Sequence, residues 1–92
     1  MITAVVLIDA VHDRIPEVAQ ALAEINGVSE VYSVAGRFDL VAMVRVAEHD
    51  QLADVIAGAV DRVQGVERTE TLIAFRAYSR HDLEAAFSLG LS

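Results

Sequence analysis

The sequence predicts one α+β domain in which four strands and two helices follow one another as β-α-β-β-α-β. Four segments are rich in β-branched and aromatic residues with alternating faces, which is typical of strands. Two other segments carry apolar residues at helical spacing. The two halves of the chain also resemble each other in sequence. At 92 residues the chain has the length of a single domain, residues 1–92.

The first half of the chain predicts a strand, a helix and a second strand. Residues 2–10 are apolar on both faces, which indicates a strand that is covered on both sides. A helix is expected over residues 15–26, with Pro16 in its first turn and Asn26-Gly27 as a left-handed stop. Residues 28–34 are expected to form the second strand.

The second half repeats this order. The third strand is expected over residues 38–47. The second helix is expected to start at Asp50 as its N-cap and to carry its apolar stripe as far as Val63. The fourth strand is expected over residues 66–78. A short final helix is expected to begin at residues 79–82, where a serine precedes an acid by three positions.

A tight turn is expected between the second and third strands. Gly36-Arg37 lies between Ala35 and Phe38 and fits a two-residue type II′ turn, because glycine tolerates a positive φ at the first central position. A three-residue loop with a glycine bulge is the alternative. Asp39 follows the turn, and its ordinary interpretation is a solvated carboxylate at a strand end.

The internal repeat has an offset of 38 residues, which brings Gly27 onto Gly65 and Val6 onto Val44. Two βαβ halves of this kind form the ferredoxin-like sandwich. Right-handed crossovers then place both helices on one face of a four-stranded antiparallel sheet. The first and third strands are apolar on both faces, so the other face needs a cover. Sheet-on-sheet packing in a twofold dimer is the simplest one.

Composition excludes several classes of function. The chain has no cysteine, so disulfides, thiolate-metal sites and cysteine nucleophiles are ruled out. The net charge is −7, and the seven basic residues are scattered arginines, so no basic patch for nucleic acid is expected. No signal peptide is recognisable, and no apolar run approaches the ~18 residues of a membrane span. The cytoplasm is therefore the expected location.

Few residues suggest chemistry on their own. The three histidines stand at element boundaries without metal-ligand spacing: His12, His49 and His81. No metal site, cofactor loop or nucleophile motif is expected. Glu67 and Glu70, near Thr69 and Thr71, could bind a cation or an ammonium group, although exposed strands often carry such residues.

The hairpin over residues 31–40 resembles the signature of the RAM domain, the effector-binding half of the Lrp/AsnC transcriptional regulators. That signature reads apolar-Tyr-x-apolar-small-Gly-x-aromatic-Asp-apolar. Residues 65–71 also resemble the start of the family's fourth strand, and the resemblance covers residues 2–78. It implies a ferredoxin-like domain that dimerises through its sheet and assembles dimers into larger rings. It also implies that amino acids bind between dimers, near the glycine-aspartate hairpin.

The resemblance implies one set of ligand-binding residues: Ala35, Gly36, Arg37, Phe38, Asp39, Thr69 and Thr71. Gly36 would offer its backbone to the ligand, and Asp39 would receive an α-ammonium group or hold the loop. Family members carry an N-terminal helix-turn-helix, whereas here the first strand begins at once. The resemblance therefore implies a stand-alone RAM protein that does not bind DNA directly and can pair with a full-length regulator.

The leading hypothesis is a non-enzymatic domain that senses a small molecule, with an amino acid as the expected effector, and oligomerises. One alternative is a small dimeric α+β barrel enzyme of the monooxygenase or isomerase type, which has the same fold but needs polar residues inside the barrel. A second alternative is an ACT-type regulatory module. Such modules carry a glycine-rich loop after the first strand, where this chain has residues 11–15 without glycine.

Overall fold

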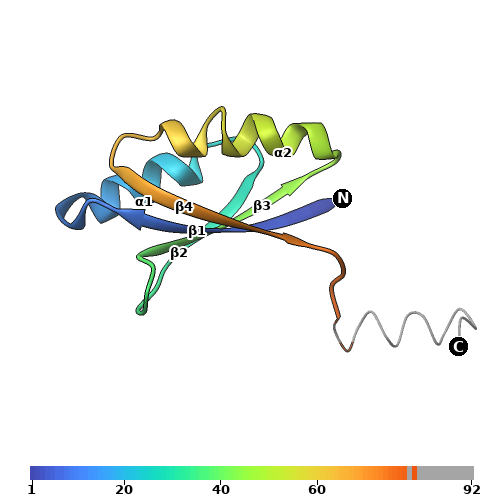
Figure 1. Cartoon of the computed structure of the whole chain (residues 1–92), viewed down its shortest axis with the longest axis horizontal. Helices are drawn as coiled ribbons and strands as arrows, with labels where there is room; N and C mark the ends of the chain where they lie inside the picture. The colour runs from blue at the N-terminus through green and yellow to red at the C-terminus, as the bar shows by residue number, and fades with distance from the viewer. Residues whose placement is uncertain (79, 81–92) are drawn as a thin grey trace, which may run out of the picture.

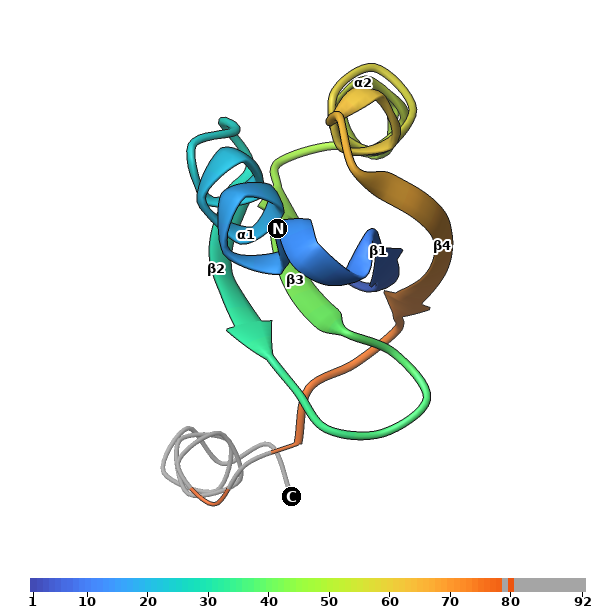
Figure 2. The same cartoon turned by 90° about the vertical axis from the view of Figure 1, so that its left-hand side faces the viewer.

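A computed structural model describes residues 1–78 and residue 80 as one antiparallel sheet with two helices on one face (Figure 1). The strands are β1 (Ile2–Ala10), β2 (Val28–Ser33), β3 (Leu40–Val46) and β4 (Val66–Ala74), in the order β2-β3-β1-β4. The helices are α1 (Ile15–Ala23) and α2 (His49–Ile56), with short 3₁₀ turns η1 (His12–Arg14) and η2 (Val60–Arg62). Figure 2 shows both helices on the same side of the sheet. The predicted ferredoxin-like fold is confirmed.

The core lies between the helices and the inner face of β1 and β3. Alternate residues of β1 are fully buried, and the register pairs Val6 with Ala42 and Ala4 with Val44. The helices contribute Val18 and other buried residues on the predicted stripes: Leu22, Leu52 and Val55. The apolar residues at helical spacing in the two helices therefore pack against the alternate residues of β1 and β3 in a single apolar layer.

Two glycines bring the halves together. Gly27 and Gly65, which match in the repeat, have φ values of 101° and 100°. A Cβ on Gly27 would lie 2.7 Å from Cγ2 of Val55, and one on Gly65 would lie 2.6 Å from Cγ2 of Val18. Each glycine thus combines a left-handed conformation with a close approach to a helix of the other half.

Both helices are shorter than expected. α1 ends at Ala23 instead of residue 26, where the chain tightens into i→i+3 hydrogen bonds such as Ile25 N–H to the Leu22 carbonyl. α2 begins at His49, and the prediction of Asp50 as its N-cap was wrong. Glu48 is the N-cap instead, because it is extended and forms a capping box with Gln51.

α2 also ends earlier than the apolar stripe indicated. It stops at Ile56, and the chain continues through Gly58 into η2. A Cβ on Gly58 would collide with the backbone carbonyl of Asp54. The residues after α2 still bury part of the stripe, since Val60 is fully buried in η2.

β4 ends at Ala74, so the prediction that it extends to residue 78 was wrong. Ala74 pairs with Thr3, and β1 begins at Ile2, so only one residue of β1 remains beyond this pair and residues 76–78 have no partner on β1. The short final helix expected from residues 79–82 lies outside the described residues, apart from Arg80.

The prediction of a two-residue turn between β2 and β3 was also wrong, and so was the alternative of a three-residue loop. Ser33 pairs with Leu40, and the Val34 N–H donates to the Asp39 carbonyl at 3.1 Å, which leaves residues 35–38 as the loop. The Asp39 N–H donates to the Ile8 carbonyl at 3.0 Å, so Asp39 continues the pairing of β3 with β1 and is not part of the loop. Gly36 does have a positive φ, 143°, as expected.

The sheet face away from the helices, called the open face below, is apolar at its centre. Val5 pairs with Met43 and with Leu72, and Leu7 pairs with Val41. These side chains are only partly buried, and Leu72 is 52% exposed. Within residues 1–78 and 80, no helix covers this face (Figures 1 and 2).

Candidate ligand-binding site

Asp39 ties the hairpin loop to the end of β1. Its Oδ2 accepts a hydrogen bond from the Ala10 backbone N–H at 2.9 Å. Its own backbone N–H donates to Ile8, two residues earlier on β1. The carboxylate therefore extends the contact between β3 and β1 past the last paired backbone group. Asp39 has a structural partner and is not merely a solvated strand end.

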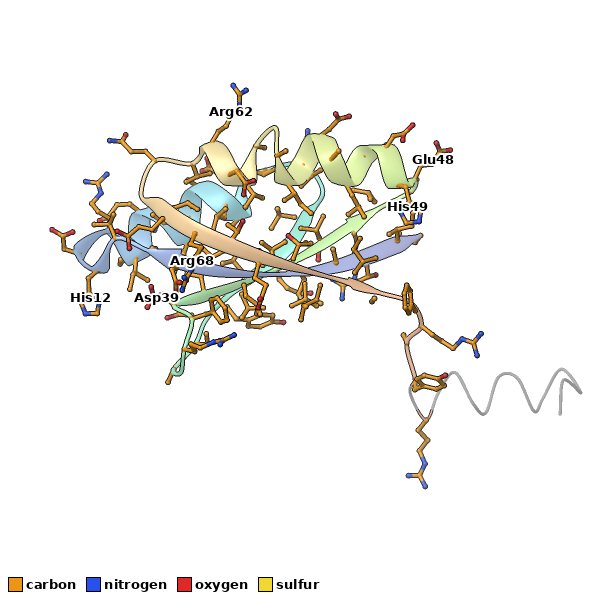
Figure 3. The ribbon with its side chains drawn as sticks, in the orientation of Figure 1. His12, Asp39, Glu48, His49, Arg62 and Arg68 are labelled. Atoms are coloured by element: carbon orange, nitrogen blue, oxygen red, sulfur yellow. The ribbon has the colours of Figure 1, made fainter. Side chains whose placement is uncertain are left out.

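Two open grooves meet at Arg68, at the end of the sheet that also carries Asp39 and His12 (Figure 3). The first, called the loop groove, has a volume of about 250 Å³ and is lined by Arg37, Phe38, Arg68, Thr69 and Glu70. The second, called the acidic groove, has a volume of about 590 Å³ and is lined by Asp9, Ala10, Val11, His12, Asp39, Glu67 and Arg68.

Arg68 is held from one side by Asp9. Its Nε and Nη2 both donate to Oδ2 of Asp9, at 3.2 and 2.9 Å. The Arg68 side chain remains 74% exposed, whereas that of Asp9 is 21% exposed. Asp9 therefore fixes the direction of the guanidinium group and leaves most of its surface open to a ligand.

Arg37 and Glu70 form a looser pair on the other side of the loop groove. Arg37 Nη2 lies 3.8 Å from Glu70 Oε2, and both side chains are more than half exposed. The Arg37 guanidinium carbon also lies 5.0 Å from the centroid of the Phe38 ring. An exposed pair at this distance contributes little to stability, so a ligand can separate it at small cost.

The loop groove thus presents two guanidinium groups, one carboxylate and one aromatic ring. Guanidinium groups bind carboxylates through paired, charge-assisted hydrogen bonds. A carboxylate such as Glu70 accepts hydrogen bonds from an ammonium group. This combination suits a small zwitterion with an apolar side chain.

The structure gathers some of the predicted site residues and separates others. Arg37, Phe38 and Thr69 line the loop groove, and Asp39 lines the acidic groove. Ala35, Gly36 and Thr71 line neither. The Thr69 hydroxyl donates to Asp61 Oδ1 at 3.0 Å, and Thr69 and Thr71 share register with the inward residues Ile8 and Val6. Their hydroxyls therefore belong to the helix side of the sheet.

Sequence reasoning missed Arg68 and Asp9. Arg68 alternates with Thr69, so it shares the open face with Glu70, and the antiparallel register brings it opposite Asp9. The alternation of residues along β4 could therefore have placed Arg68 on the same face as Glu70. The pairing with Asp9, 59 residues away, depends on the register.

A second polar cluster lies at the other side of the open face, on β2 and β3. Arg45 Nη1 lies 2.7 Å from Glu30 Oε1 and also donates to the Ser29 hydroxyl. The hydrogen bond with Arg45 lowers the pKa of the Glu30 carboxyl. The hydrogen bond with Glu30 raises the pKa of the Tyr32 hydroxyl. This cluster borders the apolar centre of the face.

In the described part of the chain, no three histidine or carboxylate side chains gather to hold a metal ion. In the same residues, no helix is long and apolar enough to cross a membrane.

A family model described as the Lrp/AsnC ligand binding domain matches residues 3–83. The chain belongs to this family. It is 38% identical over 63 residues to the HTH-type transcriptional regulator LrpA1 of Halobacterium salinarum, across 68% of this chain and 44% of that protein. The chain spans about 39–50% of the length of the curated relatives that it matches.

Solved structures of the family share this fold. The chain is 51% identical to TTHA0845 from Thermus thermophilus, with a TM-score of 0.82, across 87% of this chain and 100% of that one. It is 30% identical to the feast or famine regulatory protein of M. tuberculosis complexed with L-methionine, with a TM-score of 0.70. That match covers 87% of this chain and 54% of the other. The predicted Lrp/AsnC relationship is confirmed.

Proposed function

We propose that this chain is a non-enzymatic domain that binds an amino acid and assembles into dimers and larger oligomers. The observation that carries the proposal is the loop groove, where Arg37, Arg68 and Glu70 supply both charges that a zwitterion needs. Membership of a ligand-binding domain family supports it, as does the relative solved with L-methionine. The curated relatives are named HTH-type transcriptional regulators, which supports a non-enzymatic role.

Each groove residue has a distinct role in this proposal. Arg68 binds the α-carboxylate on the surface that Asp9 leaves open, and Arg37 adds a second guanidinium group. Glu70 accepts the α-ammonium group after it separates from Arg37. The Phe38 ring contacts the ligand's side chain.

The remaining predicted residues support the groove. Asp39 holds the loop through Ala10. Ala35 and Gly36 set the loop's path and, in an assembly of dimers, present backbone groups to a ligand bound between copies. Thr69 and Thr71 place β4 against the helix layer.

We also propose that the domain acts in the cytoplasm and pairs with a full-length regulator of the same family. The net charge of −7 opposes direct binding to the phosphate backbone. Mixed assembly would use the open face, whose apolar centre favours a second sheet.

A thermal-shift screen of the common amino acids tests the proposal. A ligand that binds only the folded protein raises its melting temperature. We expect at least one amino acid to do so, while its methyl ester and its N-acetyl derivative do not, because each lacks one charge. The proposal is wrong if no amino acid at about 10 mM shifts the transition, since stabilisation at that concentration needs only millimolar affinity.

A further inference from the structure

Exposed apolar residues concentrate where β4 ends. Leu72 and Ile73 are about half exposed, Phe75 is fully exposed and Tyr78 is 75% exposed. Residues 75–78, called the arm below, leave the sheet on the side away from the helices (Figures 1 and 2). Within the described residues, no part of the chain covers the Phe75 ring. A fully exposed aromatic side chain, with a second exposed aromatic side chain three residues later, is an unusual use of apolar surface.

A small groove of about 360 Å³, called the notch below, opens at the root of the arm. Met1, Thr3, Met43 and Arg45 line one side of it, and residues 74–77 line the other. Thioether sulfur atoms make favourable contacts with aromatic rings, and so does a guanidinium group. Glu30 fixes the Arg45 guanidinium at the edge of this side of the sheet. The chemistry of the notch therefore suits an aromatic side chain.

We propose that the arm of one copy of this chain lies in the notch of a second copy, and that the exchange is reciprocal about a twofold axis. The arm and the notch adjoin each other, so one axis that passes near Ala74 satisfies both contacts at once. The inference extends the open-face pairing of the proposed function, and it does not depend on ligand binding.

The area supports a second copy as the occupant. Phe75 and Tyr78 each offer roughly 150–250 Å² of buried surface, so two arms contribute about 600–1,000 Å². A stable interface buries about 1,200–2,000 Å² in total. The arms thus supply around half of the requirement, and the apolar centre of the open face, which is continuous with the notch through Leu72 and Met43, supplies the rest.

Crosslinking tests the exchange without background, because the chain has no cysteine. Ala77→Cys protein is refolded together with Thr3→Cys protein and treated with a short bismaleimide. We expect a covalent dimer that joins residues 77 and 3, identified by mass spectrometry. The matched control pairs Ala77→Cys with His12→Cys, in η1 just beyond the far end of β1 (Figure 3), and we expect no dimer from it.

A second variant tests the energetic role of the aromatic rings. Phe75→Ser combined with Tyr78→Ser leaves the buried core intact, so folding is preserved. We expect it to raise the dimer dissociation constant at least tenfold, while Val34→Ser, another exposed apolar residue, leaves it within twofold.

Three results would overturn the exchange. One is a dimer by light scattering that gives no 77–3 crosslink. Another is a monomer. The third uses a variant that carries both Ala77→Cys and Thr3→Cys: a 77–3 link that forms within this chain, while the mixed single variants give none, would mean that the arm stays on its own notch. A dimer that binds an amino acid in calorimetry but gives no 77–3 crosslink would contradict the exchange and leave the proposed function intact, whereas a monomer would contradict both.

Discussion

The side-chain oxygen Oδ2 of Asp39 accepts the backbone N–H of Ala10 at 2.9 Å, and this bond joins the hairpin to the end of β1. The register of β1 with β4 shifts between Asp9 and Ala10, where regular pairing breaks. A side chain thus satisfies a backbone donor at an irregular point of the sheet. Asp39 lines the acidic groove and directly follows Arg37 and Phe38, so the bond anchors the end of the hairpin loop whose residues line the loop groove.

We expect Asp39→Ala to lower the free energy of unfolding by about 1–3 kcal/mol, because it leaves the partly buried Ala10 N–H without its acceptor. Asp39→Asn keeps an oxygen acceptor, so it should cost less than about 1 kcal/mol. Urea denaturation followed by circular dichroism measures both. Equal costs for the two variants would show that the negative charge of Asp39 matters more than the hydrogen bond.

Gly65→Ala should destabilise the fold more than Gly36→Ala. Both glycines have positive φ, so alanine adds backbone strain of about 1–3 kcal/mol at each. At Gly65 the new Cβ also meets Val18 Cγ2, which adds about 1–3 kcal/mol of overpacking. At Gly36 no atom lies within 4 Å of it. Denaturation midpoints of the two variants make the comparison, and a larger loss at Gly36 would contradict it.

Periodicity predicted the elements of this fold well because burial of Val18, Leu22 and Val6 follows the helical and strand periods. Element ends depended on partners that are distant in sequence. β4 stops one residue before β1 reaches its own end at Ile2, and the Asp39 backbone N–H bonds to Ile8 on β1 instead of closing a tight turn. Neither the end of β4 nor the length of the hairpin loop can be predicted from the residue types at the turn itself.

The residues of the candidate site could likewise be predicted only where a local sequence pattern pointed to them. The hairpin signature pointed to Arg37 and Phe38, which do line the loop groove. Arg68 gains its defined orientation from Asp9 on a neighbouring strand. Such a pairing follows from sheet register, which residue spacing within one strand does not determine.

Leu7→Lys should convert the protein into a folded monomer, because it places a charge in the apolar centre of the open face. Light scattering of the wild type at micromolar concentration should give a mass of at least about 20 kDa, twice the 9.9 kDa of one chain. Gln20→Lys, on the exposed side of α1, makes the same charge change and should leave the mass unaltered. A monomeric wild type, or a dimeric Leu7→Lys protein, would contradict pairing through the open face.

The central claim is that the loop groove binds an amino acid through Arg68 and Glu70. Isothermal titration calorimetry, with the amino acid that most stabilises the wild type, tests it most directly. We expect Arg68→Gln and Glu70→Gln each to weaken binding at least tenfold, since each leaves one charge of the ligand unpaired. Arg62→Gln, an exposed arginine in η2 (Figure 3), is the control and should bind within twofold of the wild type. Unchanged affinity in both groove variants would contradict the account.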